Sequence, residues 1–515
     1  MSTIVIQGLT PGFKVPGFWA NEIIPGGGTS SPLYTKTCLL IGAPDATATA
    51  TSNVVYPILS ASDADQFGTR SQLATMIRGC DGNGGALAVP GATIYACALT
   101  PSSGAVTLSL VVSGTATSTG QYSFRVCGVR CAISILIGDS ATAVGDKIVA
   151  ACNANEYLPV TAHNSSGTVT FTVSSLGMDP SQYLFASDAS KIATGVTVAI
   201  TGGTPLSDGL IPFSGTYTAP STTVTTILAA LLPAQYDVYG IPFGNGTGGL
   251  SGPDLTIIGK FATQFNTKAG PLEGRLETGI YCSNGSESDA QYLSQYGAKS
   301  TQLGALWFAN SETPCAVIAA FFASYRASVE SSNPSPRYIN VPLRGVAPQA
   351  SMADWPSVDT QNTCLNNGVS PIKTAPDGTV ILVRGITTYS QVPGSSPSSQ
   401  DDRVLDWNQR VMPDYARTRL AQLWNQDWSP NYTYVRDNPS STEPTPPGGV
   451  LYPKLMAALI QAEVLDWEDN GWVYDAENYY PIVQYDSNSR KLVAELTVLP
   501  TPVNAQFGMN IRQRV

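Results

Sequence analysis

Residues 366–390, NNGVSPIKTAPDGTVILVRGITTYS, carry the clearest structural pattern in this 515-residue chain. The Asn-Asn-Gly at the start and the Pro-Asp-Gly near the middle are turn sequences, because glycine accepts a positive φ and proline presets a corner. An apolar run follows each turn, and the second run, Thr379 to Val383, is rich in β-branched residues. The stretch therefore predicts a β-turn-β unit that fixes the position of Arg384 at a strand end.

Strands and helices alternate regularly in the region before this unit, from residue 214 to residue 363. Apolar residues recur there at helical spacing in four segments, and a short β-prone run follows each of them. Helices are expected at 222–232, 253–267, 286–298 and 314–329, and strands at 236–243, 276–282, 305–309 and 338–343. Successive βα units of this kind are typical of a parallel sheet.

Residues 36–100 supply further elements of the same kind. Strands are expected at 37–41 and 93–99, and the helix between them should be capped by Ser62, with Asp65 three residues later. We therefore predict an α/β middle domain of the Rossmann-like alternating type. It combines this segment with the alternating region described above.

Residues 101–213 interrupt this α/β domain and differ from it in composition. They are rich in Ser, Thr, Val and Gly, and apolar and polar residues alternate in runs such as AVTLSLVVSG and GTVTFTVSS. One helix is expected among them, since Val144, Ile148 and Cys152 are four residues apart. The segment is predicted to be a β-rich inserted domain on the outside of the protein.

Residues 364–515 are expected to form an α+β C-terminal domain. Two long helical stretches, 401–428 and 453–469, are separated by a proline-rich linker. The end of the chain, from about 488 to 515, is predicted to be a strand-forming arm. Its last strand alternates polar residues with the apolar residues Val503, Ala505, Phe507, Met509 and Ile511.

The first 35 residues form a second predicted arm. Short β-prone pieces in residues 1–35 are broken by prolines and by a triple glycine, so they cannot build a core of their own. Unpaired strand edges are a liability in a monomer, but they become useful when a neighbouring copy completes them. The whole chain is thus expected to be an α+β multidomain protein with extended strands at both ends.

Composition limits the class of partner. The formal net charge is −10 and only 12% of the residues are charged, so the surface should be broad and mostly neutral, which suits contact with other proteins. A nucleic-acid partner would need a basic stripe, and the sequence has none. No secretory leader or membrane-length apolar run is visible, so membrane insertion and export are not expected. Nine cysteines without paired spacing predict reduced thiols and assembly in a cytoplasm.

Residues with potential chemistry are sparse. The glycine-rich loop at 244–252 follows a strand and precedes a helix, where α/β sheets bind phosphates, but it lacks a Lys-Ser/Thr pair. Cys127 and Cys131 could share a strand face, yet His163, expected in a turn, is the only histidine, so a zinc site is not predicted. No catalytic, cofactor-binding or metal-binding residue is therefore assigned.

Two other interpretations stay open beside a structural role. A nucleotide- or cofactor-binding enzyme would use the glycine loop of the alternating region, and an adhesin would be built on the β-rich insert. The helix expected at 401–428 mixes charged residues with Trp407 and Trp424. It is either a solvated face with internal salt bridges or a contact surface, since arginine and tryptophan are common in binding hot spots.

Several segments, in this order, resemble contractile phage tail sheath proteins, especially those of Mu-like phages and related myophages. The first is VPGFWANEI at 15–23, and the second is residues 39–79, which include FGTRSQLATM. Residues 141–172 are similar to the insert of the Mu-like group. The similar C-terminal segments are SPRYINVPLRGVAPQ at 335–349 and CLNNGVSPIKTAPDGTVILVRGITTY at 364–389.

The resemblance implies a subunit that polymerises into stacked six-fold rings around a tail tube and contracts without a nucleotide. It also implies a sheet in which two C-terminal strands of one subunit are joined by an N-terminal and a C-terminal strand from neighbours. The apolar residues of these exchanged arms would be Val15, Phe18, Trp19, Ile23, Val503, Ala505, Phe507, Met509 and Ile511. The Pro/Gly-rich stretches at 25–32 and 499–502 are candidate hinges.

The same resemblance implies further partners and roles. Arg384 would anchor the core of the C-terminal domain, and the second long helix would face the tube through Lys454, Gln461, Glu463 and Trp467. The partners would be other copies of the chain, the tail tube protein, and baseplate and tail terminator proteins, with no cofactor. The protein would belong to the tail of the virion and be assembled in the cytoplasm of a bacterial host.

Overall fold

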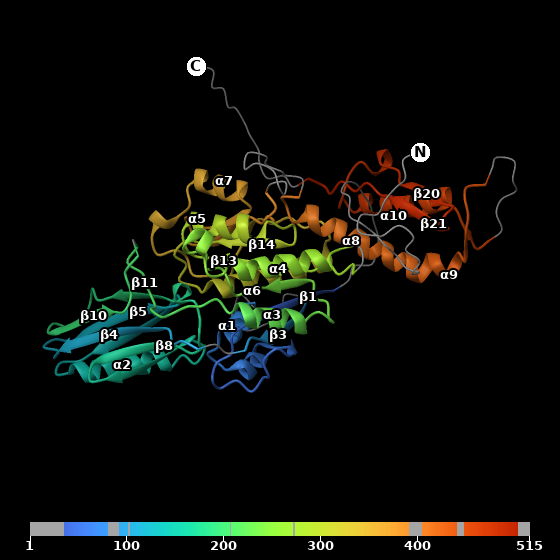
Figure 1. Cartoon of the computed structure of the whole chain (residues 1–515). Coiled ribbons are helices and arrows are strands. Elements are labelled where there is room, and N and C mark those ends of the chain that lie inside the picture. The colour runs from blue at the N-terminus through green and yellow to red at the C-terminus, as the bar shows by residue number, and fades with distance from the viewer. Residues whose placement is uncertain are drawn as a thin grey trace, which may run out of the picture.

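A computed structural model describes residues 35–80, 92–100, 103–206, 208–270, 273–390, 404–439 and 448–502. These residues form a mixed α+β fold with several sheets. Figure 1 shows three regions, with a β-sandwich at one end, a large sheet covered by helices in the middle and a helical C-terminal unit at the other end. Buried apolar residues gather in four cores, one in the sandwich, one on each face of the large sheet and one in the C-terminal unit.

The large sheet has nine strands. Their spatial order is β15 (Ile339–Pro342), β17 (Val380–Arg384), β16 (Val369–Thr374), β14 (Leu303–Trp307), β13 (Thr278–Ser283), β12 (Val238–Gly240), β1 (Lys36–Gly42), β3 (Ala92–Ala98) and β2 (Val55–Ile58). Pairing is parallel from β3 through to β16, as the alternation of strands and helices predicts. The strands β2 and β17 pair antiparallel with their neighbours.

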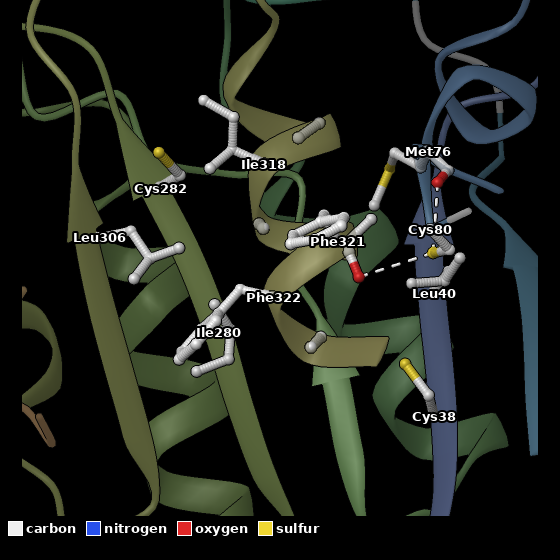
Figure 2. Close-up of a cluster of buried hydrophobic side chains, with 14 of the residues drawn as sticks. Cys38, Leu40, Met76, Cys80, Ile280, Cys282, Leu306, Ile318, Phe321 and Phe322 are labelled. Atoms are coloured by element: carbon white, nitrogen blue, oxygen red, sulfur yellow. Dashed lines mark hydrogen bonds between the residues drawn. The ribbon is translucent and has the colours of Figure 1, made fainter. Parts of the chain in front are cut away.

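Helices cover both faces of this sheet because its central strands are apolar on both sides. One face carries α1 (Gln72–Gly79) and α6 (Cys315–Ser332), and the other carries α3 (Ser221–Ala230), α4 (Leu255–Lys268), α5 (Glu287–Tyr292) and α7 (Val358–Asn366). Figure 2 shows α6 packed over the sheet, with Phe322 next to Ile280. The Cys80 side chain lies at the end of α1, beside α6. Its thiol donates to the carbonyl oxygen of Met76 at 3.3 Å.

The helix expected to be capped by Ser62 is divided in two, so that prediction is wrong. A 3₁₀ helix at Ala61–Phe67 comes first, and the Ser60 amide donates to Asp63 at its start. The α-helix α1 is capped by Ser71, whose Oγ accepts from the Ala74 amide at 2.9 Å. Gly68, with φ +89°, separates the two helices, and a glycine in this left-handed region interrupts continuous helix.

The β-turn-β unit predicted around residue 377 is present. Strands β16 and β17 pair antiparallel, and the turn between them is closed by a bond from the Gly378 amide to the Ala375 carbonyl at 2.9 Å. Gly378 has φ +84°, which explains the glycine in the turn sequence. Both strands belong to the nine-stranded sheet, so the C-terminal domain predicted from residue 364 shares its first strands with the α/β region.

The inserted segment folds into a sandwich of two four-stranded sheets. One sheet has the order β10 (Val196–Thr201), β4 (Thr107–Gly114), β8 (Thr168–Val173) and β7 (Val160–Ser165). The other has the order β11 (Ile211–Pro212), β9 (Leu184–Asp188), β5 (Gly120–Val126) and β6 (Val129–Ile135), and the helix α2 (Ala141–Asn153) packs beside them. Alternate residues are buried, and the rings of Phe124, Phe171 and Phe185 meet in the core.

The C-terminal unit is built on two long helices. Its elements are α8 (Asn408–Leu423), a π-helical turn (Trp424–Trp428), α9 (Ser429–Asn431), β18 (Tyr434–Val435), β19 (Val450–Leu451), α10 (Pro453–Asp469), β20 (Ile482–Asp486) and β21 (Lys491–Glu495). Helix α10 has the bounds that the sequence predicts, and Pro453 occupies its first turn. Within the described residues, no helix has the length and apolar character needed to cross a membrane.

Candidate assembly surfaces

The strands β20 and β21 form a small antiparallel sheet at the end of the described chain. Val483 and Leu492 face the core between α8 and α10, whereas Ile482 keeps 55% of its surface exposed. Among the described residues no third strand pairs with either edge. A sheet of only two strands is marginally stable, and each open edge presents main-chain donors and acceptors to a further strand.

This two-stranded sheet rests on a well-packed support. Trp467 of α10 is fully buried, and its ring lies edge-on to Tyr415 of α8 at 6.0 Å. The Trp467 indole also donates to Glu463 Oε1 at 3.1 Å, and the same carboxylate pairs with Arg419 of α8 at 2.8 Å. The two helices therefore hold the sheet as one body.

The predicted arm residues cannot be placed. Val15, Phe18, Trp19, Ile23, Val503, Ala505, Phe507, Met509 and Ile511 all lie outside the described residues, as does the candidate hinge at 25–32. The second candidate hinge, at 499–502, is described. Thr501 is anchored there, since its amide donates to Trp472 at 3.0 Å and its carbonyl accepts from Asn408 at 2.9 Å.

The four residues predicted to face a tube do not share one surface of α10. Trp467 and Gln461 are buried inside the C-terminal unit, and the Gln461 amide donates to the Ala476 carbonyl at 3.0 Å. Glu463 is half-buried in its pair with Arg419, and only Lys454 is exposed. The outer face of the helix instead carries Ala458, Ala462 and Leu465.

Arg384 connects the large sheet to the C-terminal unit. Its guanidinium makes two parallel bonds to Asp406, with Nε to Oδ1 at 2.8 Å and Nη2 to Oδ2 at 2.6 Å. This fork-to-fork geometry is the strongest arrangement of an arginine with a carboxylate. The anchor role proposed for Arg384 fits this contact, although the partner carboxylate was not part of the prediction.

The charged residues of α8 are mostly used within the chain. Arg410 pairs with Asp414 at 2.5 Å, and both side chains are buried. Arg417 reaches the large sheet's helices and donates to the Ala269 and Gly270 carbonyls at 2.6 and 2.9 Å. These contacts favour the interpretation of α8 as an internally bridged helix over that of an exposed contact surface.

The glycine-rich loop at 244–252 directs its first amides to a carboxylate of the same chain. The Gly244 and Asn245 amides donate to Asp254 Oδ2 at 2.9 and 2.7 Å, and the Tyr217 hydroxyl donates to Oδ1 at 2.5 Å. Burial, together with the neighbouring Asp179 carboxylate, raises the pKa of Asp254 to about 7. The position where a phosphate would bind is therefore filled by Asp254.

The other residues with possible chemistry are dispersed. His163 lies on strand β7 opposite Thr170 and is exposed, so its expected position in a turn is wrong. Cys127 sits in the β5–β6 turn with φ +51°, while Cys131 is on β6, so the two do not share a strand. None of the nine cysteines forms a disulfide, and all nine are buried. Over the described ranges, no cluster of three or more metal-ligating side chains is present.

Strand β20 belongs to the candidate assembly surface and is an element that the sequence analysis did not predict. A signal for it exists, since Ile482 to Asp486 is a short β-prone run and the following Ser-Asn-Ser-Arg is rich in turn residues. Arg490 adopts φ +53° in this turn. The proline before the run and the preceding aromatic residues hide the period-two pattern, which is why the strand is easily read as a loop.

Comparison with known proteins gives results only at the level of structure. No family model matches the chain, and no curated protein matches it in sequence. A sheath tail protein from Listeria innocua is similar with a TM-score of 0.46 at 10% identity, covering 92% of this chain and 93% of its own. One from Desulfitobacterium hafniense gives 0.45 at 11% identity, covering 95% and 96%. The helical sheath of the anti-feeding prophage in its contracted state gives 0.40 at 11%, covering 98% and 100%. Two of these three structures, each similar over nearly the whole chain, are described as sheath tail proteins and the third as a helical sheath.

Proposed function

We propose that this chain is the structural subunit of a contractile tail sheath. In this proposal it polymerises as stacked hexameric rings around a tail tube and contracts to drive the tube through a host envelope. Other copies of the chain, the tube, the baseplate and the tail terminator are its partners, and the tail of a virion is its location. The domain boundaries and arm residues expected from the sequence are part of the same proposal.

The observation that carries the proposal is the two-stranded sheet β20–β21. It lies in the C-terminal unit, and within the described part of the chain neither of its edges pairs with a further strand. Strand addition from neighbouring copies would complete this sheet with many main-chain hydrogen bonds. The strand-forming sequences at both ends of the chain supply the donors.

Contraction then requires that each subunit move as a rigid body. The contacts that join the described regions suit this requirement, because Arg384 and Arg417 tie the C-terminal unit to the central sheet. The work of contraction would come from new interfaces that form between subunits as a metastable extended polymer shortens. No nucleotide is consumed in such a conversion.

The alternative of a cofactor-binding enzyme has less support. Its proposed site is the glycine loop, where Asp254 already takes the amides that would hold a phosphate. Gly246 also packs against the carbonyl of Asp289, where a Cβ would lie 2.4 Å from that oxygen, so the loop is closed by protein rather than open to a ligand. A calorimetric titration with ATP and NAD would show no saturable heat if this argument is right.

Electron microscopy tests the sheath proposal directly. Purified full-length chain should form hollow tubes or rings in negative stain, and deletion of residues 1–24 should abolish them without unfolding the subunit. The variants Gln484→Pro and Tyr485→Pro, made separately, test the edge of β20 that would receive a further strand. Of two adjacent residues in a strand, one points its amide outward, and proline at that residue removes the hydrogen-bond donor.

Matched controls place the same change on another edge strand. Thr197→Pro and Val198→Pro alter β10, at the edge of the sandwich, and should leave tubes intact. Circular dichroism establishes that each variant is folded. Tubes that persist both in the deletion and in the two β20 variants would contradict arm exchange, whereas a full-length chain that stays monomeric under all assembly conditions would contradict the sheath role itself.

A further inference from the structure

The sandwich meets the α/β region along a polar junction. Arg125 on β5 makes a two-pronged bond to Glu312, which precedes α6, with distances of 2.8 to 3.1 Å. The Asn284 amide donates to the Ser181 carbonyl at 2.7 Å, and the Gln182 amide donates to the Pro242 carbonyl at 3.1 Å. Two pairs of aspartates also cross this junction, and neither is used in the proposed assembly.

The first pair joins Asp208, in the sandwich, to Asp354, at the end of the 3₁₀ helix Met352–Asp354. Each carboxyl has one satisfied oxygen, since Asp208 Oδ1 accepts from the Leu210 amide at 3.1 Å and Asp354 Oδ1 accepts from Asn310 at 2.8 Å. Each Oδ2 is buried without a donor. Burial and, beside it, the Asp208 carboxyl raise the pKa of Asp354, and two carboxyl groups can bond only when one of them is protonated.

The second pair joins Asp179, in the sandwich, to Asp254, in the α/β region. Both are almost completely buried. Asn245 connects them, because its side-chain amide donates to Asp179 Oδ1 at 2.8 Å while its main-chain amide donates to Asp254 Oδ2 at 2.7 Å. Tyr217, on the segment that leaves the sandwich, donates to the same Asp254 carboxyl.

No lysine or arginine of the described chain forms an ion pair with any of these four carboxyls. The titratable groups that face Asp179 and Asp254 are the uncharged Tyr183, Tyr217 and Cys315. Asp208 borders a cavity of about 390 Å³ that is also lined by Arg125, Arg130 and Asp188. Of these, only the two arginines could donate. Arg125 is committed to Glu312, and Arg130 is exposed and forms no ion pair with Asp208 among the described residues.

We propose that these two aspartate pairs form a proton-dependent latch between the sandwich and the α/β region. The latch is closed while each pair holds a proton, and it loosens when the pairs lose their protons and the like charges repel. Because the pairs lie within one chain, this inference goes beyond the assembly role and can be tested whether or not the protein polymerises.

The direction of the pH dependence follows from linkage. Burial raises the pKa of Asp254 to about 7, and burial also raises the pKa values of Asp179 and Asp354. Exposed aspartates titrate near pH 4, so opening the junction releases protons in the range between these values. The closed state is therefore favoured below pH 7, and its advantage falls as the pH rises through 7. For the proton on Asp254 alone, the equilibrium constant for opening the junction rises about tenfold between pH 6 and pH 8.5.

Hydrogen–deuterium exchange measures this opening in the full-length chain. The reporters are the Gly244 and Asn245 amides, which donate to Asp254, and the Phe213 amide, which donates to the Tyr183 carbonyl at the base of the sandwich at 3.0 Å. With labelling times scaled to the intrinsic exchange rate at each pH, their protection should fall about tenfold from pH 6 to pH 8.5. Protection in the strands of the sandwich core, such as β8, should stay constant.

Three variants separate the latch from general pH effects. Asp208→Asn provides an amide that can donate to Asp354 at any pH, and Asp179→Asn removes the charge beside Asp254, so each should reduce the pH dependence. The double variant should reduce it further and leave only the part that comes from the burial of Asp254. Asp188→Asn is the matched control, because Asp188 lines the same cavity but bonds only within the sandwich. A wild-type protection factor that does not change with pH would overturn the latch, as would a control variant that changes it as much as Asp208→Asn.

Discussion

Single buried charges show how much of this fold depends on pairing. Lys268 on α4 is 1% exposed and Glu277 before β13 is 0% exposed, and the Lys268 ammonium lies 2.9 Å from both carboxylate oxygens. Arg326 on α6 is also fully buried and lies 3.5 Å from the centre of the Trp407 ring. Such groups are tolerated only while their partners remain in place.

We expect Glu277→Gln to destabilise the α/β region by about 3 to 5 kcal/mol, because it leaves the Lys268 charge buried without a counter-charge. Urea denaturation followed by circular dichroism gives the change in the free energy of unfolding. The double variant Lys268→Met/Glu277→Leu is the control and should recover most of this loss. A single variant as stable as the wild type would mean that water reaches Lys268.

The position of a single residue could be predicted where the sequence immediately around it determines the backbone conformation. Arg384 was expected at a fixed strand end because turn chemistry and β-branched residues surround it, and it is found there. Its partner Asp406 lies 22 residues further along the chain, and that pairing depends on how α8 docks, which no local pattern encodes. The carboxylate that fills the glycine loop, Asp254, could not be assigned for the same reason.

At the level of elements, helix α10 and the β16–β17 unit were predicted well, because a proline at the helix start and glycines in the turns leave the backbone few choices. The start of α1 was predicted wrongly. Ser62 and Asp65 have the right residue types for a cap, but Gly68 breaks the helix and Ser71 caps the second part. Two serines of similar local sequence were thus distinguished only by the packed structure.

The two serines give a direct test of the cap. Ser71→Ala should lower the free energy of unfolding by about 1 kcal/mol, because the Ala74 amide loses its acceptor in a buried site. Ser62→Ala, at a serine whose hydroxyl bonds only to Ser60 on the surface, should change it by less than about 0.5 kcal/mol. Thermal unfolding monitored by circular dichroism compares them, and equal effects would show that Ser71 does not act as the cap.

At the scale of the whole molecule, the alternation of strands and helices was enough to predict a parallel central sheet. It was not enough to predict the strand order, in which β1 and β3 from the first hundred residues join β12 beyond the sandwich. It also did not show that β16 and β17 complete the same sheet. Such long-range pairings depend on the summed packing of many faces rather than on any one sequence pattern.

The nine cysteines report on the integrity of this whole arrangement. All are buried and none forms a disulfide, and burial raises the pKa values of Cys97, Cys152 and Cys364 to about 12. Because only the thiolate reacts, a thiol reagent such as Ellman's should label almost none of the nine in the native chain at pH 8. All nine should react after unfolding in guanidinium. Rapid labelling of several thiols in the native protein would contradict the packing described here.

The two ends of the sandwich meet where it joins the central sheet, since Thr107 and Ser214 exchange two main-chain hydrogen bonds of 2.8 Å. A foreign domain whose termini lie close together could therefore replace the sandwich between these two positions without changing the strand connections of the central sheet. The graft would need one compensating change, because Glu312 loses Arg125 when the sandwich is removed. Substituting Glu312 with glutamine would remove the negative charge that Arg125 balances in the native chain, so that a new domain could occupy the place of the sandwich.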